Sequence, residues 1–543
     1  MKKYIFLSLI LITAIATSNA KHRTRYEILK SAQAVLSQHT GNRAMSQADS
    51  PLDIIKSNSQ LTIVGDKNGF AVVANDDRFP AILGYSDKQF DGGQVAPGFQ
   101  WWMDAITEQL EYNLEHGLQL TTATPSAGKH KDNVPALMVT QWGQNTPYNN
   151  QTPTYTSGKN EVHYVTGCVA TAMAQIMYYH KWPERGKGQV SYYFTPEGST
   201  AKQKLTANLA KAPYDWDNML TSYSKGYTEE QANAVSTLML HCGYSVNMQY
   251  TKSGSGAFTS DAADAMRKRF YYNENMHFYR RDFFPDEEWM DKIFTELTEG
   301  FPVLYGAQSS TGGHEFVFDG YNAEGQVHVN WGWNGGQNGF FDIAALNGYT
   351  SGQEMVLVRK DSEIIPYQSY WGMSEDGLTA SFLGSTVKAS FVAYNLDYNT
   401  FTGKVGFLAM NLSNMSITVL DSNDKTAIEY LSGAHFDYNS NISSLTDGKY
   451  RLYAGSQSEK ETEWQPIRCY ETSNNSYILT INDGVASIEK ENNANWTGIE
   501  EGLIVDSDNK ARYFDLQGRE VSSETKGLLI RKQGNEVKKV IVR

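Results

Sequence analysis

The segment that most constrains this chain is Val165-Thr-Gly-Cys-Val-Ala-Thr-Ala-Met-Ala-Gln-Ile-Met-Tyr-Tyr-His180. Its apolar run predicts a buried helix, and Cys168 stands directly after Gly167, where that helix begins. A thiol at a helix N-terminus lies at the positive end of the helix dipole, which lowers the pKa of the thiol and favours the thiolate. Free cysteines are also among the most buried residue types and often only pack. Cys168 is therefore a candidate nucleophile only if a histidine elsewhere completes the pair.

The composition favours a multidomain secreted protein. A chain of 543 residues suffices for about three or four domains, and 40% hydrophobic residues can build cores. The net charge of −13 and the lack of a long basic run argue against nucleic acid as a partner. The cysteines, Cys168, Cys242 and Cys469, leave at least one thiol unpaired and have no zinc-site spacing. No sequence feature demands a metal or a cofactor.

The first part of the chain predicts an export signal followed by a compact α/β unit. Residues 1–20 combine Lys2-Lys3, a short apolar stretch and a small-residue cleavage site, which is typical of a signal peptide. Residues 21–131 form the next unit, with helices expected at 25–38 and 99–116 and strands at 61–64, 70–73 and 81–85. Residues 118–133 are polar and irregular and contain Lys129 and Lys131, so they are either an interdomain linker or a processing site.

The central unit, residues 132–362, places a second reactive residue far from the cysteine. Helices are expected after Cys168 and at 228–239, 261–270 and 287–299, and strands at 301–305, 314–321 and 326–333. His314 follows two glycines and opens a hairpin whose turn is Asn322-Ala-Glu-Gly325. A helix-borne cysteine and a sheet-borne histidine can meet across a cleft.

The remaining residues predict β-structure. Residues 363–492 contain alternating runs at 379–383, 405–410 and 476–481, which favour an immunoglobulin-like β-sandwich. Residues 493–543 form a short β-prone tail. The expected fold class is α+β, with an α/β N-terminal unit, a catalytic unit made of a helix-rich half and a β half, and a β-sandwich module.

Three separated motifs carry a resemblance. The segment around Cys168, Gly312-Gly-His-Glu-Phe-Val-Phe-Asp-Gly320 and His328-Val-Asn-Trp-Gly-Trp333 resemble the streptopain family of papain-type cysteine proteases, its interpain-type members above all. Residues 70–86 resemble the core of that family's propeptide. The resemblance implies a papain-like fold and a secreted cysteine endopeptidase made as a zymogen. Its partners would be protein or peptide substrates and its own propeptide, which acts as an intramolecular inhibitor.

The resemblance also implies roles for single residues. Cys168 would be the nucleophile, His314 the general base, and Gln144 an oxyanion-hole donor together with the backbone N–H of the cysteine. Gln144 is preferred to Gln141 because the family's glutamine lies three residues before Pro-Tyr-Asn. The group that orients His314 is either Asn330 or Trp331.

Substrate contacts follow from the same resemblance. Ser255 and Gly313 match family positions that contact the substrate backbone, and Trp333 either lines the cleft or fills the core. The family tends to favour a hydrophobic residue two before the scissile bond, with Met248, Tyr250 and Ala257 as expected lining.

The C-terminal tail and four further histidines have interpretations outside the active site. The tail, with Leu516-Gln-Gly-Arg519 and a basic β-prone end, resembles the C-terminal sorting domain of the type IX secretion route, which implies outer-membrane secretion machinery as a partner. Four other histidines have structural interpretations. His163 is expected in an exposed loop, and the others are expected to pack or to end a helix: His180, His241 and His328.

Two rival functions remain. A transglutaminase-like enzyme would need an acidic partner on the strand after the histidine, and Asp319 is available there. Asp319 lies five residues after His314, however, and successive residues of a strand point to opposite faces, so the two would face apart. A non-catalytic adhesin would have no need of Cys168, His314 and Gln144 together.

Overall fold

The computed structural model describes residues 21–39, 52–211, 213–309, 312–349, 352–363, 365–470 and 472–491, with backbone strands in the tail. The predicted signal peptide at 1–20 and most of the predicted tail at 493–543 lie outside the described residues. The chain divides into two compact units, Met1–Tyr367 and Gln368–Arg543. Among the described helices, none combines the length and apolarity that crossing a membrane requires.

The N-terminal segment is close to the prediction. It contains α1 (Arg25–His39), β1 (Asp53–Ser57), β2 (Leu61–Asp66), β3 (Gly69–Ala74), β4 (Ile82–Ser86) and α2 (Pro97–His116). Thr24 and Glu27 cap α1 reciprocally, since the Glu27 carboxylate accepts from the Thr24 N–H and the Thr24 hydroxyl accepts from the Glu27 N–H. The apolar face of α1 then packs on β2, β3 and β4. The sequence pattern missed β1, whose residues are mostly exposed.

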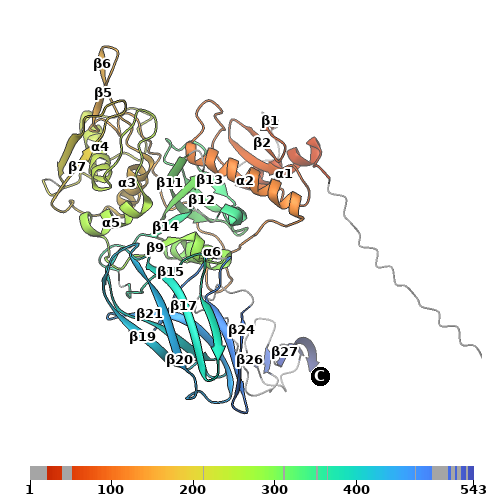
Figure 1. The fold of residues 1–543 in the computed structure, drawn as a ribbon. Coiled ribbons are helices and arrows are strands. Elements are labelled where there is room, and N and C mark those ends of the chain that lie inside the picture. The colour runs from red at the N-terminus through yellow and green to blue at the C-terminus, as the bar shows by residue number, and fades with distance from the viewer. Residues whose placement is uncertain are drawn as a thin grey trace, which may run out of the picture. The chain divides into compact units, whose positions relative to one another are not determined.

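One antiparallel sheet runs through the N-terminal segment and the central unit. Its strand order is β1-β2-β3-β4-β13-β12-β11-β10-β14-β9. The junction pairs β4 with β13 (Gly339–Phe341), Tyr85 opposite Phe340 and Gly84 opposite Phe341. A Cβ at position 84 would lie 2.3 Å from Phe341 Cδ1, so glycine permits this close approach. The α2 helix packs on β11 (Gly312–Tyr321), beyond that junction (Figure 1).

The helices of the central unit are α3 (Cys168–His180), α4 (Glu229–Ser245), α5 (Thr259–Arg269) and α6 (Asp286–Glu299). Three of them, α3, α5 and α6, pack on this sheet, and α4 packs on α3 and α5. Thr228 caps α4 with Gln231 in a capping box, which explains the predicted start, and the helix continues six residues past the predicted end. The α3 and α5 helices contact β10 (Val303–Ser309), and so does α6.

The other strands of the central unit are short. They include β12 (Val327–Asn330), which ends before the predicted 333 because Trp331 enters a loop and its N–H donates to Asn338 Oδ1. The rest comprise two hairpins, two strands at the far edge of the sheet and two 3₁₀ turns: β5 (Thr154–Ser157), β6 (Asn160–His163), β7 (Gln189–Phe194), β8 (Gln203–Asn208), β9 (Phe278–Arg280), β14 (Glu354–Leu357), η1 (Arg281–Phe283) and η2 (Ala344–Tyr349).

The part of the second unit before the tail is a two-sheet β-structure, as the alternating runs predict. One sheet orders β15-β17-β16 with β20, and the other orders β19-β18-β21-β23-β24 with β22. Buried side chains of both sheets share one core. The strands are β15 (Trp371–Met373), β16 (Thr379–Leu383), β17 (Thr386–Asn395), β18 (Phe401–Asn411), β19 (Ile417–Ile428), β20 (Gly433–Asn441), β21 (Gly448–Ser458), β22 (Gln465–Pro466), β23 (Ser476–Asn482) and β24 (Val485–Lys490).

The described part of the tail is a four-stranded antiparallel sheet. Its order is β26-β25-β27-β28. The strands are β25 (Arg512–Phe514), β26 (Glu520–Val521), β27 (Gly527–Gln533) and β28 (Glu536–Val542).

Candidate active site

The N-terminus of α3 carries Cys168 as its first residue. Gly167 before it has φ +89°, a left-handed conformation that favours glycine. A Cβ there would also lie 2.8 Å from both the Met248 side chain and the Ser255 carbonyl oxygen. Glycine therefore lets the chain turn into the helix while the loop at residues 248–255 packs directly against the turn. Cys168 is half-buried, whereas Cys242 and Cys469 are buried, and none of the three forms a disulfide.

The electrostatics around Cys168 keep its thiol protonated. Burial raises the pKa of Cys168 to about 11, and the Glu315 carboxyl group adds to the shift. Hydrogen bonds from backbone N–H groups, that of Glu315 first, act in the opposite sense but are outweighed. The helix N-terminus, which favours a thiolate, therefore does not dominate the pKa of Cys168.

His314 lies on β11 and lines the same cavity as Cys168, which has a volume of about 520 Å³. Along a regular strand His314 shares a face with Phe316, whose ring packs 6.1 Å from Trp101 of α2. Burial lowers the pKa of His314. Among the described residues no hydrogen bond to its imidazole is found. The structure thus brings Cys168 and His314 to one cavity, with both groups neutral and the imidazole on the face that α2 covers.

Gln144 lies beside the start of α3. Its side chain is buried, and its backbone carbonyl accepts a hydrogen bond of 3.1 Å from the N–H of Thr166, two residues before Cys168. Gln141 instead lies against the loop after β12, since a Cβ at Gly335 would meet its side chain at 2.9 Å. The loop at residues 141–149 therefore contacts the turn before Cys168 at Gln144, whereas Gln141 contacts the loop after β12.

The two candidates for orienting His314 make other contacts. Asn330 donates from Nδ2 to the Thr140 carbonyl (2.9 Å) and accepts at Oδ1 from the Gly332 N–H (3.1 Å). Trp331 donates from Nε1 to the Gln337 carbonyl, and its ring packs on Phe99 of α2 and on Phe316. Asn330 thus holds the loop after β12, and Trp331 lies between the central unit and α2.

Some of the residues expected to contact substrate line the cavity, and others pack in the surrounding loops and core. Gly313 lines the cavity, and so does Ala257. Ser255 is buried, and its hydroxyl donates to the Val165 carbonyl at 2.7 Å, so it fixes the loop to the turn before Cys168. Trp333 is half-buried in the loop after β12. Met248 and Tyr250 belong to the core and do not line the cavity, which instead contains Val246, Asn247 and Gln249.

The other histidines have structural partners. His328 Nδ1 lies 2.5 Å from Asp319 Oδ1, and the other Asp319 oxygen accepts from the Met138 N–H. His180 ends α3 and contacts the Tyr272 hydroxyl, and His241 is buried beside the Tyr214 hydroxyl. The acid that a transglutaminase-like triad would need is thus bonded to a different histidine.

Sequence reasoning missed Glu315 and Thr259, which also line the cavity. The Thr259 hydroxyl donates to Glu315 Oε2 at 2.8 Å. The available signal was a carboxyl group directly after the candidate catalytic histidine and directly before the apolar run Phe316-Val-Phe318. Among the described residues, no group of three or more His, Cys, Asp or Glu side chains could hold a metal ion.

A helix-start cysteine that shares a cavity with a sheet-borne histidine defines a papain-like thiol hydrolase. Residues 142–341 match the peptidase C10 family, and residues 28–110 match the Spi protease inhibitor family. Streptopain of Streptococcus pyogenes is 34% identical over 290 residues, 51% of this chain and 72% of that protein. The chain therefore belongs to the peptidase C10 family, and the streptopain-like resemblance is confirmed.

Two further relatives show the extent of the likeness. Thiol protease/hemagglutinin PrtT of Porphyromonas gingivalis is 32% identical over 375 residues, which are 63% of this chain but 41% of that protein. The structure of a fragment of prointerpain A from Prevotella intermedia matches with 39% identity and a TM-score of 0.52, over 56% of this chain and 97% of that fragment. The likeness thus covers the N-terminal segment together with the central unit.

Proposed function

We propose that this chain is a secreted cysteine endopeptidase made as an inactive precursor, with protein or peptide substrates. The observation that carries the proposal is the single cavity shared by Cys168 and His314, beside a helix N-terminus. In the released enzyme, His314 takes the Cys168 proton, and the thiolate attacks the substrate carbonyl carbon. The imidazolium then protonates the leaving amine, and the peptide C–N bond breaks to give an acyl-enzyme. Water, deprotonated by His314, hydrolyses the thioester and restores the thiol.

Gln144 is the proposed side-chain donor to the oxyanion, together with the Cys168 backbone N–H. The contact between the Gln144 carbonyl and Thr166 supports this role, because it holds the glutamine loop at the cysteine turn. Asn330 or Trp331 orients His314 after release. Ser255, Gly313 and Trp333 are the proposed substrate-binding residues, and Ser255 acts by holding its loop.

The N-terminal segment is the proposed intramolecular inhibitor. It contributes β1–β4 to the sheet that bears His314, and α2 covers the face of β11 on which His314 lies. Loss of this segment uncovers the end of β11, so that the imidazole can turn towards Cys168. The segment therefore keeps the dyad apart through packing.

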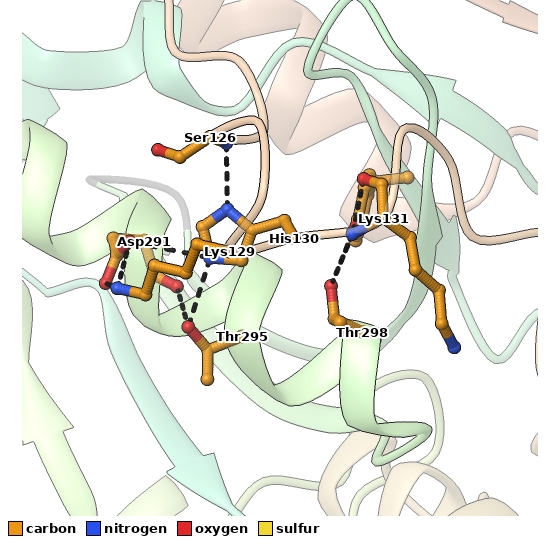
Figure 2. Close-up of polar contacts among 8 residues, drawn as sticks. Ser126, Lys129, His130, Lys131, Asp291, Thr295 and Thr298 are labelled. Carbon is orange, nitrogen blue, oxygen red and sulfur yellow. Dashed lines mark hydrogen bonds and ion pairs between the residues drawn. The ribbon is translucent and has the colours of Figure 1, made fainter. Parts of the chain in front are cut away.

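Maturation is proposed to cut the chain near Lys129 or Lys131, at the end of residues 21–131. Residues 118–133 form no helix or long strand. Three of them are bound to α6 by a set of contacts that we call the α6 clasp (Lys129, His130 and Lys131; Figure 2). Lys129 Nζ pairs with Asp291 at 2.5 Å, and the Lys131 N–H contacts the Thr298 hydroxyl at 3.4 Å.

His130 is the buried member of the α6 clasp. It accepts at Nδ1 from the Ser126 N–H (2.9 Å), and its Nε2 lies 3.2 Å from the Thr295 hydroxyl (Figure 2). Only 8% of the residue is exposed. The clasp must therefore leave α6 before a peptidase can bind this segment in extended form.

Export is proposed to use the signal peptide at residues 1–20. The tail at 493–543 is proposed to engage outer-membrane secretion machinery. The sorting-domain resemblance of the tail supports this step.

Expression of the Cys168→Ala protein tests the proposal. We expect a folded, unprocessed and inactive protein, while Cys469→Ala, which removes a buried thiol of the other compact unit, should mature normally. N-terminal sequencing of the active wild type should give a start at about residues 130–134, within or just past the α6 clasp. Full proteolysis by Cys168→Ala, or full activity of a chain that starts at Lys21, would refute the corresponding part.

The same preparation separates the rival enzyme class. Casein hydrolysis that an epoxysuccinyl thiol inhibitor abolishes is expected of a peptidase. Crosslinking with ammonia release and no new peptide termini would instead support a transglutaminase-like enzyme.

A further inference from the structure

We infer that Glu315 makes the cavity beside Cys168 a specificity pocket for a basic side chain of the substrate, lysine or arginine, close to the scissile bond. The inference rests on the proposed function and goes beyond it by naming the substrate class. It replaces the hydrophobic preference that the family resemblance implies.

Glu315 occupies a row of side chains across three strands. It faces Gly306 on β10, and Gly306 faces Glu354 on β14. A Cβ at Gly306 would lie 2.1 Å from Thr259 Oγ1 and 2.8 Å from Glu315 Oε2. The glycine therefore leaves the space into which the carboxyl group and its threonine partner fit.

The carboxyl group is buried and only partly bonded. The residue is 4% exposed; Oε2 accepts from Thr259, whereas Oε1 is buried without a hydrogen-bond partner. A buried polar atom without a partner costs free energy, which a ligand with a matching donor recovers on binding. An ammonium or guanidinium group is the strongest such donor to a carboxylate.

The charges around the cavity favour a cation. Asp261 also lines it, and among the described lining residues there is no lysine or arginine. Arg280, which faces Glu354 across β9 and β14, pairs with Asp282 at 3.3 Å and lies 3.9 Å from Glu354. That arginine is thus shared between two other carboxylates, and the positive charge that would complement Glu315 must come from the substrate.

The protonation of Glu315 is consistent with this role. Burial first, and the Glu354 carboxyl group second, raise the pKa of Glu315 to about 8, so the empty pocket holds a neutral acid at neutral pH. A bound ammonium or guanidinium stabilises the carboxylate and releases the proton to solvent. A neutral apolar side chain gives no such exchange and leaves Oε1 unsatisfied.

The chain carries a sequence of the kind such a pocket would select. The proposed processing segment is Lys129-His130-Lys131, at the end of the N-terminal unit. A pocket that accepts lysine would let a released enzyme molecule cleave a precursor at this segment once the α6 clasp of that precursor opens.

The test uses the full-length chain after maturation and a set of peptides that differ at one position at a time. Each position from four before to three after the scissile bond carries lysine, arginine or norleucine, which has a side chain similar in length to that of lysine but no charge. We expect one position at which the wild type cleaves the basic peptides about tenfold or more faster in kcat/KM than the norleucine peptide. Glu315→Gln keeps the shape and removes the charge, and it should reduce that ratio about tenfold.

Glu354→Gln is the matched control, because it removes an acid of the same row that does not line the cavity. Because the Glu354 carboxyl group raises the pKa of Glu315, its removal should not reduce the ratio. A wild type that prefers norleucine at every position, or a Glu315→Gln protein with an unchanged ratio, would overturn the inference while the proposed function stands. Failure of the wild type to cleave any peptide of the set would overturn both.

Discussion

Cys168 in the intact precursor should be alkylated far more slowly than an ordinary thiol. Burial and the Glu315 carboxyl group raise the pKa of Cys168 to about 11, against about 8.5 for a free cysteine. The difference of about 2.5 units lowers the thiolate fraction near pH 7 about 300-fold, since each unit is a factor of ten. The more basic thiolate is also the stronger nucleophile, with a Brønsted slope of about 0.4–0.5. This raises the rate constant of the thiolate about 10- to 20-fold and so offsets part of the decrease. The net expectation is a reaction about 20-fold slower than that of a free thiol.

The assay is the rate of iodoacetamide labelling at about pH 7, followed by intact mass, with peptide mapping to assign the site. The same chain in denaturant gives the rate of the free thiol. Cys242 and Cys469 should also stay unlabelled in the native precursor, because burial raises the pKa of each thiol. After maturation Cys168 should become the fastest thiol, because release of α2 lets His314 stabilise the thiolate.

Labelling should then persist in mildly acidic buffer, where a free thiol is almost fully protonated. Intact mass at each time point confirms that the precursor has not processed itself. A precursor whose Cys168 reacts as fast as in the unfolded chain, or no faster after maturation, would refute the reasoning.

Three other perturbations follow from packing and burial. Gly98→Val should weaken the packing of α2 on the central unit by about 1–3 kcal/mol through overpacking, because a Cβ there lies 2.8 Å from the Trp331 ring. Gels should show a shorter lag before self-processing, and a longer lag would contradict this. Asp319→Asn should cost about 1–3 kcal/mol of stability by weakening the bond to His328, with kcat/KM of the matured enzyme unchanged; lost activity at an unchanged Tm would instead support the acidic triad.

The third concerns pH. Burial lowers the pKa of His180 to about 4, below the unfolded value near ~6.5. The contribution of neutral His180 to the free energy of unfolding is therefore complete above about pH 6.5. It falls by up to about 1.4 kcal/mol per pH unit as the pH falls towards 4. Urea unfolding at a series of pH values should show this loss in the wild type and a smaller loss in His180→Gln. An equal pH dependence of the unfolding free energy in both proteins would contradict the prediction.

The sequence alone determined the elements and the residue types of the site. Helix and strand periodicities are local, so the starts of α1, α3 and α4 and the strands β2 to β4 lie within two residues of the prediction. Gly167 before Cys168 marks the helix start because only a residue without a Cβ tolerates that turn. The motif order in the chain indicated the peptidase family, which the comparisons confirm.

Tertiary structure decided what these residues contact. The pairing of β4 with β13 joins segments that lie 255 residues apart at Tyr85 and Phe340 (340 − 85). Nothing local specifies such a partner, because any strand edge offers the same N–H and C=O groups. The same long-range packing placed His314 on the face that α2 covers.

Burial decided the charges as well. Spacing marked Cys168 as an activated thiol, but desolvation, which depends on every neighbouring element, raises its pKa instead. In the sequence, Glu315 is one of several polar residues of β11. The fold places a glycine of β10 opposite it and brings the Thr259 hydroxyl of α5 to one of its carboxylate oxygens. The sequence thus determined which groups are present, and only the fold decided which of them are protonated, paired or left with an open hydrogen-bonding position.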